Sequence, residues 1–205
     1  MPTGPGGLDA NGVWQYGEDD TEALASDLLN LGMSSISTEV GLLDAAVAAI
    51  VTGQILQVVS TTKTLPFSTT ARDTWTDITG LSVAITPGST TSKVALSVDL
   101  GLVDASLAAQ MAFRFVRDST PVGIGTSVSS RVAASFGLVV DTPGRGIPGS
   151  GSFIDSPSTT SEITYKLQMY NGDIATAFLN TDHDDTDAVG TTRTISTITV
   201  MEVAG

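Results

Sequence analysis

A single histidine within a dense group of carboxylates is the clearest candidate for chemistry in this sequence. His183 is the only histidine of the 205 residues, and it is surrounded by Asp182, Asp184, Asp185 and Asp187. Carboxylate oxygens are the ligands that Ca²⁺ prefers, so these four aspartates are candidate metal ligands. Their spacing lacks the central glycine and the distal glutamate of an EF-hand loop. The alternative is a solvated acidic turn between two strands, and we expect no bound metal or cofactor.

Two further patterns, for catalysis and for phosphate binding, are incomplete. A Ser-His-Asp triad built on His183 would need a serine on an elbow between a strand and a helix. The run Gly149-Ser150-Gly151 is instead interpreted as a loop. The glycines of residues 143–149 lack the Lys-Ser/Thr pair of a phosphate-binding loop, which favours a mobile surface loop. We therefore predict that the chain is not an enzyme.

Three arginines are candidate ligands for an anion. Arg114, Arg117 and Arg131 could bind an anionic glycan, such as one on a host surface. The alternative is that they form ion pairs with Asp99, with Asp118 or with neighbouring subunits.

The composition and charge of the sequence exclude several classes of function. The formal net charge is −13 with only nine Lys and Arg, whereas binding to nucleic acid requires clustered basic residues. There is no cysteine, which excludes a disulfide framework and a Cys-based zinc site. The first residues lack the basic and apolar regions of a secretory signal, and no apolar run approaches the roughly 18 residues of a membrane span. We therefore predict that the chain does not insert into a membrane. We also predict that it is synthesised in a cytoplasm.

The first 35 residues form an acidic segment. No Lys or Arg precedes Lys63, and eight of the 22 acidic residues lie before Lys63, six of them within residues 1–35. Asp19 and Glu22 resemble a capping box at a helix start, and Gly32 is expected to end that helix. The apolar residues of the segment are Trp14, Tyr16, Leu24, Leu28 and Leu31. We interpret residues 1–35 as an anchor that docks on another protein with a basic rim; alternatively, the helix packs on its own β domain.

A second helix is predicted over residues 36–54. Its apolar residues are separated by alternating intervals of four and three, the spacing of a coiled-coil seam. They are Ile36, Val40, Leu43, Val47 and Ile50. We expect this seam to form a short stalk of about two heptads that joins copies of the chain, although the residue types do not fix the number of copies. A single amphipathic helix lying on the β domain would show the same spacing.

Residues 55–205 are predicted to form an antiparallel β-sandwich, most plausibly a jelly roll. Lys93 to Leu102 alternates apolar and small polar residues, as a strand with one buried face requires. Similar alternation predicts strands over residues 55–59, 81–85, 111–115, 132–138, 165–169, 174–179 and 194–203. The last of these is apolar on both faces and is expected to be central in its sheet.

Several short stretches resemble proteins of tailed bacteriophages. Part of the chain is similar to the C-terminal head domain of fibre and minor tail proteins. The similar stretches are 55–59, 78–87, 155–157 with 164–166, and 196–203, together with Arg114 and Arg117-Asp118. The stretches 14–20 and 26–30 are similar to the leader of phage virion proteins of the minor tail type. No catalytic residue comes with this resemblance.

The resemblance implies a homotrimer that is assembled in the host cytoplasm, attaches to another virion protein through its N-terminus and displays a β head on the virion surface. Host-surface binding is the function that it favours. The alternative is a capsid decoration protein that stabilises the shell at three-fold sites, since a stalk of two heptads is short for a fibre.

Overall fold

The computed structural model describes residues 7–8, 10–11, 14–15, 18–173 and 175–205, and within the helix it describes the side chains of residues 29–47. The chain divides into two compact units, Met1–Thr52 and Gly53–Gly205, which are described separately. The first unit contains β1 (Gly7–Leu8), β2 (Trp14–Gln15) and α1 (Glu18–Val51). The strands of the second unit are β3 (Ile55–Lys63), β4 (Phe67–Thr69), β5 (Trp75–Ile85), β6 (Lys93–Ala105), β7 (Ala109–Arg117), β8 (Thr120–Val122), β9 (Phe136–Val140), β10 (Ile147–Asp155), β11 (Ile163–Asn171), β12 (Ala177–Leu179) and β13 (Ser196–Val203).

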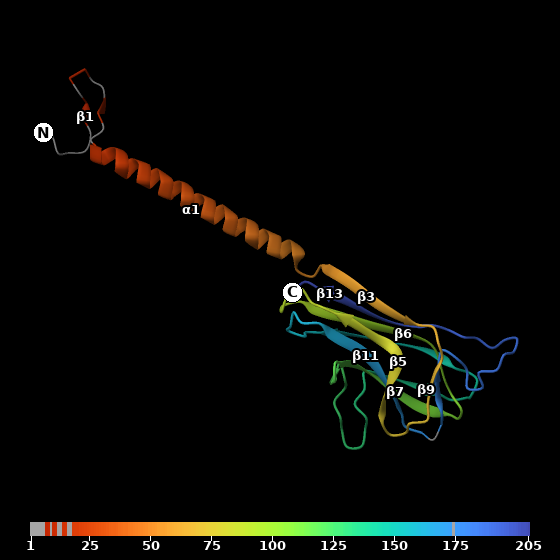
Figure 1. The fold of residues 1–205 in the computed structure, drawn as a ribbon. Helices are drawn as coiled ribbons and strands as arrows, with labels where there is room; N and C mark the ends of the chain where they lie inside the picture. Colours follow the sequence, from red (N-terminus) through yellow and green to blue (C-terminus); the bar gives the residue numbers. More distant parts are fainter. Residues whose placement is uncertain (1–6, 9, 12–13, 16–17, 174) are drawn as a thin grey trace. The chain divides into compact units, whose positions relative to one another are not determined.

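Helix α1 is continuous, so the prediction that a helix ends at Gly32 is wrong (Figure 1). One glycine inside a helix costs only about 1 kcal/mol relative to alanine. That cost is small beside the cost of nucleating a second helix separately, and Gly32 is not among the glycines with positive φ. The helix also runs across residue 35, where the sequence suggested a boundary between anchor and stalk.

The second unit is a sandwich of two antiparallel sheets, as predicted (Figure 1). In the first, here called the β6 sheet, β6 lies between β13 on one side and β10 on the other. Strand β12 pairs with β6 beyond the end of β13, and β4 pairs with β12 beyond the end of β3. Strands β3 and β4 therefore act as one interrupted strand, and β12 and β13 act as another. Strand β13 is central in this sheet, as its two apolar faces predicted.

The second sheet, here called the β7 sheet, has the order β5, β11, β7. Strands β8 and β9 pair one after the other along the free side of β7, so they too form one interrupted strand. Counted with these interruptions, the described residues form eight long strands. Their order is first, eighth, third, sixth in the β6 sheet and second, seventh, fourth, fifth in the β7 sheet, which is the order of a jelly roll.

The facing sides of the two sheets form the core. Alternation along each strand places every second side chain inward, including Val94, Leu96, Val98 and Leu100 of β6. Across the core, Met111, Phe113 and Phe115 of β7 lie beside Tyr165, Leu167 and Met169 of β11. Each large apolar side chain that is fully buried contributes about 1.5–3 kcal/mol toward offsetting the conformational entropy that the head loses on folding.

The expected loop at Gly149-Ser150-Gly151 is wrong, because these residues lie within β10. Their inward positions are glycines because β9 packs over them. A Cβ on Gly149 would lie 2.6 Å from Leu138, and one on Gly151 would overlap the ring of Phe136. The expected strand over residues 132–138 is correct only from Phe136 onward. Of the strand expected over residues 174–179, the structure forms residues 177–179, and residue 174 lies outside the described residues.

Candidate functional site

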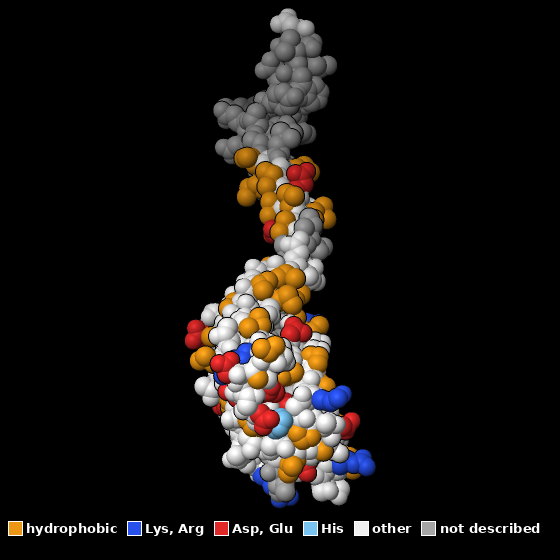
Figure 2. All heavy atoms as spheres, turned by 90° about the vertical axis from the view of Figure 1, so that its right-hand side faces the viewer, with side chains coloured by type: hydrophobic (Ala, Val, Ile, Leu, Met, Phe, Trp, Pro, Cys, Tyr) orange, Lys and Arg blue, Asp and Glu red, His pale blue; other side chains and the backbone are white. Residues whose placement is uncertain are grey.

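The predicted seam on α1 is an exposed apolar stripe. Ile36, Val40, Leu43 and Val47 are between 50% and 64% exposed, and Figure 2 shows orange hydrophobic side chains along the described part of the helix. The side chain of Ile50, the fifth predicted seam residue, lies outside the described residues. A contiguous apolar stripe on a helix indicates a surface that another chain covers.

The seam is longer than the sequence prediction allowed. Because α1 continues through Gly32, Met33 and Leu29 extend the same alternation of four and three residues, and they are 68% and 65% exposed. From Leu29 to Ile50 the apolar spacing covers about three heptads, one more than the sequence prediction, and the coiled coil stays a prediction. Sequence reasoning missed these two residues because it placed a helix end between them.

The predicted anchor residues are described only in part. Leu31 is 64% exposed on α1. Tyr16 and the side chains of Trp14, Leu24 and Leu28 lie outside the described residues. The anchor therefore stays a prediction. Within the described residues, no helix combines the length and hydropathy needed to cross a membrane.

In the head, two long insertions interrupt strands that are otherwise continuous. Residues 123–135 separate β8 from β9, and residues 180–195 separate β12 from β13. Insertions of this length in a compact domain are commonly functional, because loops carry side chains that a rigid sheet then positions.

The first insertion covers a cleft of about 560 Å³ on the outer face of the β7 sheet. The floor consists of outward-facing residues in neighbouring strands: the ladder places Tyr170 beside Ala112, and Ala112 beside Gly137. The wall consists of insertion residues that include Thr126 and Arg131. Gly137 and Ala112 carry almost no side chain, so the floor beside Tyr170 is open.

The insertion that forms this wall is held by hydrogen bonds of its own. Gly125 N donates to Ala134 O at 2.9 Å and closes the stem, and Arg131 N donates to Val128 O at 3.1 Å near the tip. Ser135 N donates to Phe113 O at 2.8 Å, which fixes the end of the insertion to β7. The wall is therefore a folded element.

Tyr170 is held in place by an aromatic and cationic cluster. Its ring lies 5.4 Å from that of Trp75, and the Arg114 guanidinium stacks on Trp75 at 4.2 Å. The Tyr170 hydroxyl donates to Asp73 Oδ1 at 3.2 Å. Burial and this carboxylate raise the pKa of Tyr170 above its ordinary value. Neither aromatic residue was singled out from the sequence, because only the strand register brings them together.

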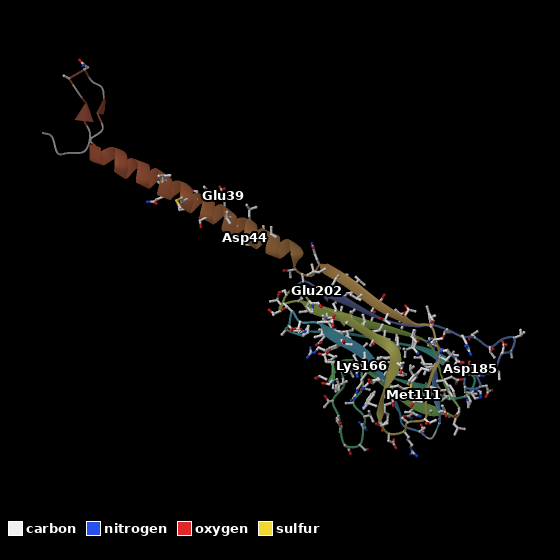
Figure 3. The ribbon with its side chains drawn as sticks, in the orientation of Figure 1. Glu39, Asp44, Met111, Lys166, Asp185 and Glu202 are labelled. Carbon is white, nitrogen blue, oxygen red and sulfur yellow. The ribbon has the colours of Figure 1, made fainter. Side chains whose placement is uncertain are left out.

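A polar network continues along the same outer face. Arg114 Nε donates to Gln168 Oε1 at 2.8 Å, Gln168 Nε2 donates to Asp77 Oδ1 at 2.6 Å, and Lys166 Nζ lies 2.7 Å from Asp77 Oδ2. Figure 3 labels Lys166 and Met111, from β11 and β7. Burial opposes ionisation of Asp77, but the hydrogen bonds from Lys166 and Gln168 outweigh it, so the pKa of Asp77 lies below its usual value. Of the three predicted anion ligands, Arg114 is thus engaged within the sheet.

The other two predicted anion ligands differ in environment. Arg117 Nη1 contacts Asp155 Oδ2 at 2.7 Å, and the same oxygen accepts the hydroxyl of the fully buried Tyr165 at 2.7 Å. Burial and Asp155 raise the pKa of Tyr165 far above its usual range. Arg131 is exposed, and among the described residues its guanidinium has no ion-pair partner.

The four candidate metal ligands lie in the second insertion, where the contacts are internal. Asp185, labelled in Figure 3, accepts two hydrogen bonds from Arg193 Nη2 at 2.9 and 3.0 Å and one from the Thr181 hydroxyl at 2.6 Å. Asp182 Oδ1 accepts Asp185 N at 2.8 Å and so closes a turn. Within the described residues, no group of three or more His, Asp or Glu side chains is placed to hold a metal ion.

His183 lies between two carboxylates. Its Nε2 is 3.1 Å from Asp184 Oδ1, and its Nδ1 is 3.5 Å from Oδ2 of the fully buried Asp104. Asp104 also accepts the backbone N–H groups of Ala105, Gly144 and His183 at 2.8 to 3.0 Å. Asp104 therefore joins the β9–β10 turn to the second insertion, a structural role with no sequence signal.

No known protein family matches the sequence, and no characterised protein matches it either. Among solved structures, the chain is similar to the VP2 subviral particle of infectious bursal disease virus, with a TM-score of 0.35 and 16% identity over 72% of this chain and 38% of that one. The Gx strain structure of the same virus gives a TM-score of 0.35 and 16% identity, over 74% of this chain and 39% of that one. The Gt strain structure gives 0.36 and 13%, over 72% and 40%.

The chain thus spans about two fifths of the length of these structures. A likeness at this TM-score and identity says nothing about activity or partners, which must be inferred from the chain itself.

Proposed function

We propose that this chain is a structural protein of a bacteriophage virion, a homotrimeric short fibre or minor tail protein whose β head binds the host surface. The observation that carries the proposal is the exposed seam from Leu29 to Val47. An exposed apolar stripe of this regularity marks a surface that another surface covers, and its coiled-coil spacing favours helices of other copies. The phage-like stretches at both ends of the chain support the virion context and the trimeric state.

In this proposal the first unit has two tasks. The seam joins three copies, while Trp14, Tyr16, Leu24, Leu28 and Leu31 contact another virion protein. At 100° per residue, Leu31 lies about 120° around the helix from Leu43 in the seam. One helix can therefore pack against its copies and still present Leu31 to a partner. We propose no catalytic activity and no nucleic-acid or membrane partner.

The seam can be tested with two neighbouring leucines of similar exposure. Leu43 is 64% exposed and belongs to the seam, whereas Leu42 is 67% exposed and lies outside it. We expect the mass of the full chain in solution to correspond to three copies, and Leu43→Asp to dissociate them because it buries a carboxylate among apolar side chains. Leu42→Asp is the matched control and should leave the assembly intact.

A monomeric wild-type chain, or equal effects of the two substitutions, would refute the seam. The anchor is tested separately by replacing Leu24, Leu28 and Leu31 with Gln. This variant should remain an assembly of three copies in solution but be lost from purified particles. Normal incorporation into particles would show that the anchor is elsewhere.

A further inference from the structure

The cleft under residues 123–135 has the features of a small-ligand site. Its volume of about 560 Å³ falls in the range of ligand pockets, and apolar groups form most of its lining. Polar residues also line it, among them Gln110, Thr126 and Arg131. Such a combination suits a ligand with a flat apolar face and a polar rim.

The floor favours a ring over a peptide strand. Strand β7 pairs on both sides, with β11 and with β9, so its backbone has no free groups to bind an added strand. The space above Ala112 and Gly137 is instead bounded by the Tyr170 ring, which Trp75 supports from the side. The C–H face of a pyranose ring packs well on such a surface, and its hydroxyls can reach the polar residues of the lining.

The charge of the cleft favours an acidic ligand. The chain has 22 acidic residues and nine basic ones, yet no Asp or Glu lines the cleft and Arg131 does. Two carboxylates lie nearby, Asp73, which accepts the Tyr170 hydroxyl, and Asp173, which accepts Gln110 N at 3.1 Å, but neither lines the cleft. An unpaired guanidinium offers a bidentate site for a carboxylate.

We propose that this cleft binds an acidic saccharide, with a pyranose ring on the floor formed by Tyr170, Ala112 and Gly137 and its carboxylate on Arg131. The inference deepens the proposed host-surface function and rests on it for biological meaning. The binding chemistry itself is a property of the head and can be measured in solution.

The test uses the full-length protein, calorimetric titration and saturation-transfer NMR. The acidic probes are tri-galacturonic acid and 3′-sialyllactose, and the neutral probes are maltotriose and lactose. We expect at least one acidic probe to bind, and its affinity to exceed that of the neutral probes at least tenfold. Arg131→Gln should weaken binding of that probe at least tenfold. Arg145→Gln, which alters an exposed arginine outside the cleft, should not.

A second variant blocks the cleft without removing any hydrogen-bonding group. Gly137 is exposed on β9, and a Cβ there would lie 3.4 Å from Met111 O, so Gly137→Leu should fold and fill the floor. Binding should then be lost while the melting temperature stays within a few degrees of the wild-type value. The inference is overturned if no acidic probe binds, if neutral probes bind equally well, or if the folded Gly137→Leu variant binds like the wild type.

The outcomes also separate this inference from the proposed function. If the wild type and Gly137→Leu bind host cells with equal affinity, the cleft is not the binding site, but the proposal of host attachment stands. If the protein binds an acidic probe but is not found on virions, the proposed saccharide site stands and the proposed virion role is refuted.

Discussion

Glu202 is a buried carboxylate whose removal should destabilise the head by a predictable amount. It lies on β13, is only 2% exposed and is labelled in Figure 3. Its Oε1 accepts Gly88 N at 2.8 Å, and its Oε2 accepts Gln57 Nε2 at 2.6 Å. The carboxylate thus holds the turn between β5 and β6 against β3 and β13, and no Lys, Arg or His of the described residues forms an ion pair with it.

The size of the effect follows from these two hydrogen bonds. A hydrogen bond to a charged group contributes about 1.5–3 kcal/mol, and an unsatisfied buried donor costs a similar amount. Glu202→Gln keeps the shape but replaces one acceptor oxygen with an NH₂ group that faces other donors. We expect the free energy of unfolding to fall by about 2–4 kcal/mol, which for a domain of this size lowers the melting temperature by roughly 10 °C.

The fall in the free energy of unfolding caused by Glu202→Gln should also depend on pH. Burial alone would raise the pKa of Glu202, but the hydrogen bonds from Gln57 Nε2 and from the backbone N–H of the Gly88 turn hold it below the ordinary value of 4.5. Because the folded-state pKa is lower than the unfolded one, ionised Glu202 contributes stability above about pH 4.5. That stability is lost as the pH falls through the folded-state pKa.

Urea denaturation of the full chain at pH 7 and at pH 3.5 measures both effects. The difference between wild type and Glu202→Gln should be largest at pH 7 and should shrink at pH 3.5. Glu162→Gln, which removes an exposed carboxylate, is the matched control and should show no difference at pH 7. Equal stability of wild type and Glu202→Gln at pH 7, or a difference that does not change with pH, would refute the reasoning.

Two further predictions concern the stalk and the core. In the seam register, Glu39 and Asp44 (Figure 3) occupy positions that face each other between neighbouring copies of a parallel bundle, where two acids repel. Glu39→Lys should therefore lower the dissociation constant of the assembly, roughly tenfold at low salt and less at high salt. Sedimentation experiments measure this constant, and weaker assembly of the variant would contradict a parallel register. Tyr165→Phe removes a 2.7 Å hydrogen bond to Asp155 and should lower the free energy of unfolding in urea by about 1–2 kcal/mol; an unchanged value would show that Arg117 alone satisfies Asp155.

Much of the head could be predicted from alternation, because its strands have one buried and one exposed face. Alternation predicts β5, β6, β7 and β11, whereas β13 is predicted from apolar residues on both of its faces. The sequence does not predict β10 because two of its inward positions, Gly149 and Gly151, are glycines. Larger residues there would clash with Leu138 and Phe136 of β9. Glycine density suggests a loop when the packing partner is unknown.

The candidate cleft could not be predicted, because it depends on pairing between distant segments. Tyr170, Ala112 and Gly137 come from three strands, and only their register places them side by side. Arg131 was a candidate from the sequence, but nothing local indicated which of three arginines would remain free. The structure engages Arg114 and Arg117 and leaves Arg131 at the cleft.

The continuity of α1 changes the balance between the two virion roles that the sequence suggested. A stalk of two heptads made capsid decoration a serious alternative, because it keeps a head close to whatever the N-terminus binds. Since Gly32 does not end the helix, α1 alone is roughly 50 Å long at 1.5 Å per residue, and its seam gains Leu29 and Met33. A protein that only caps a shell needs no such length, whereas a protein that holds a binding domain away from its attachment point does. We therefore favour the fibre or minor tail role. Antibody labelling of purified particles tests this choice: signal at the tail is expected, and signal spread over the capsid would restore decoration.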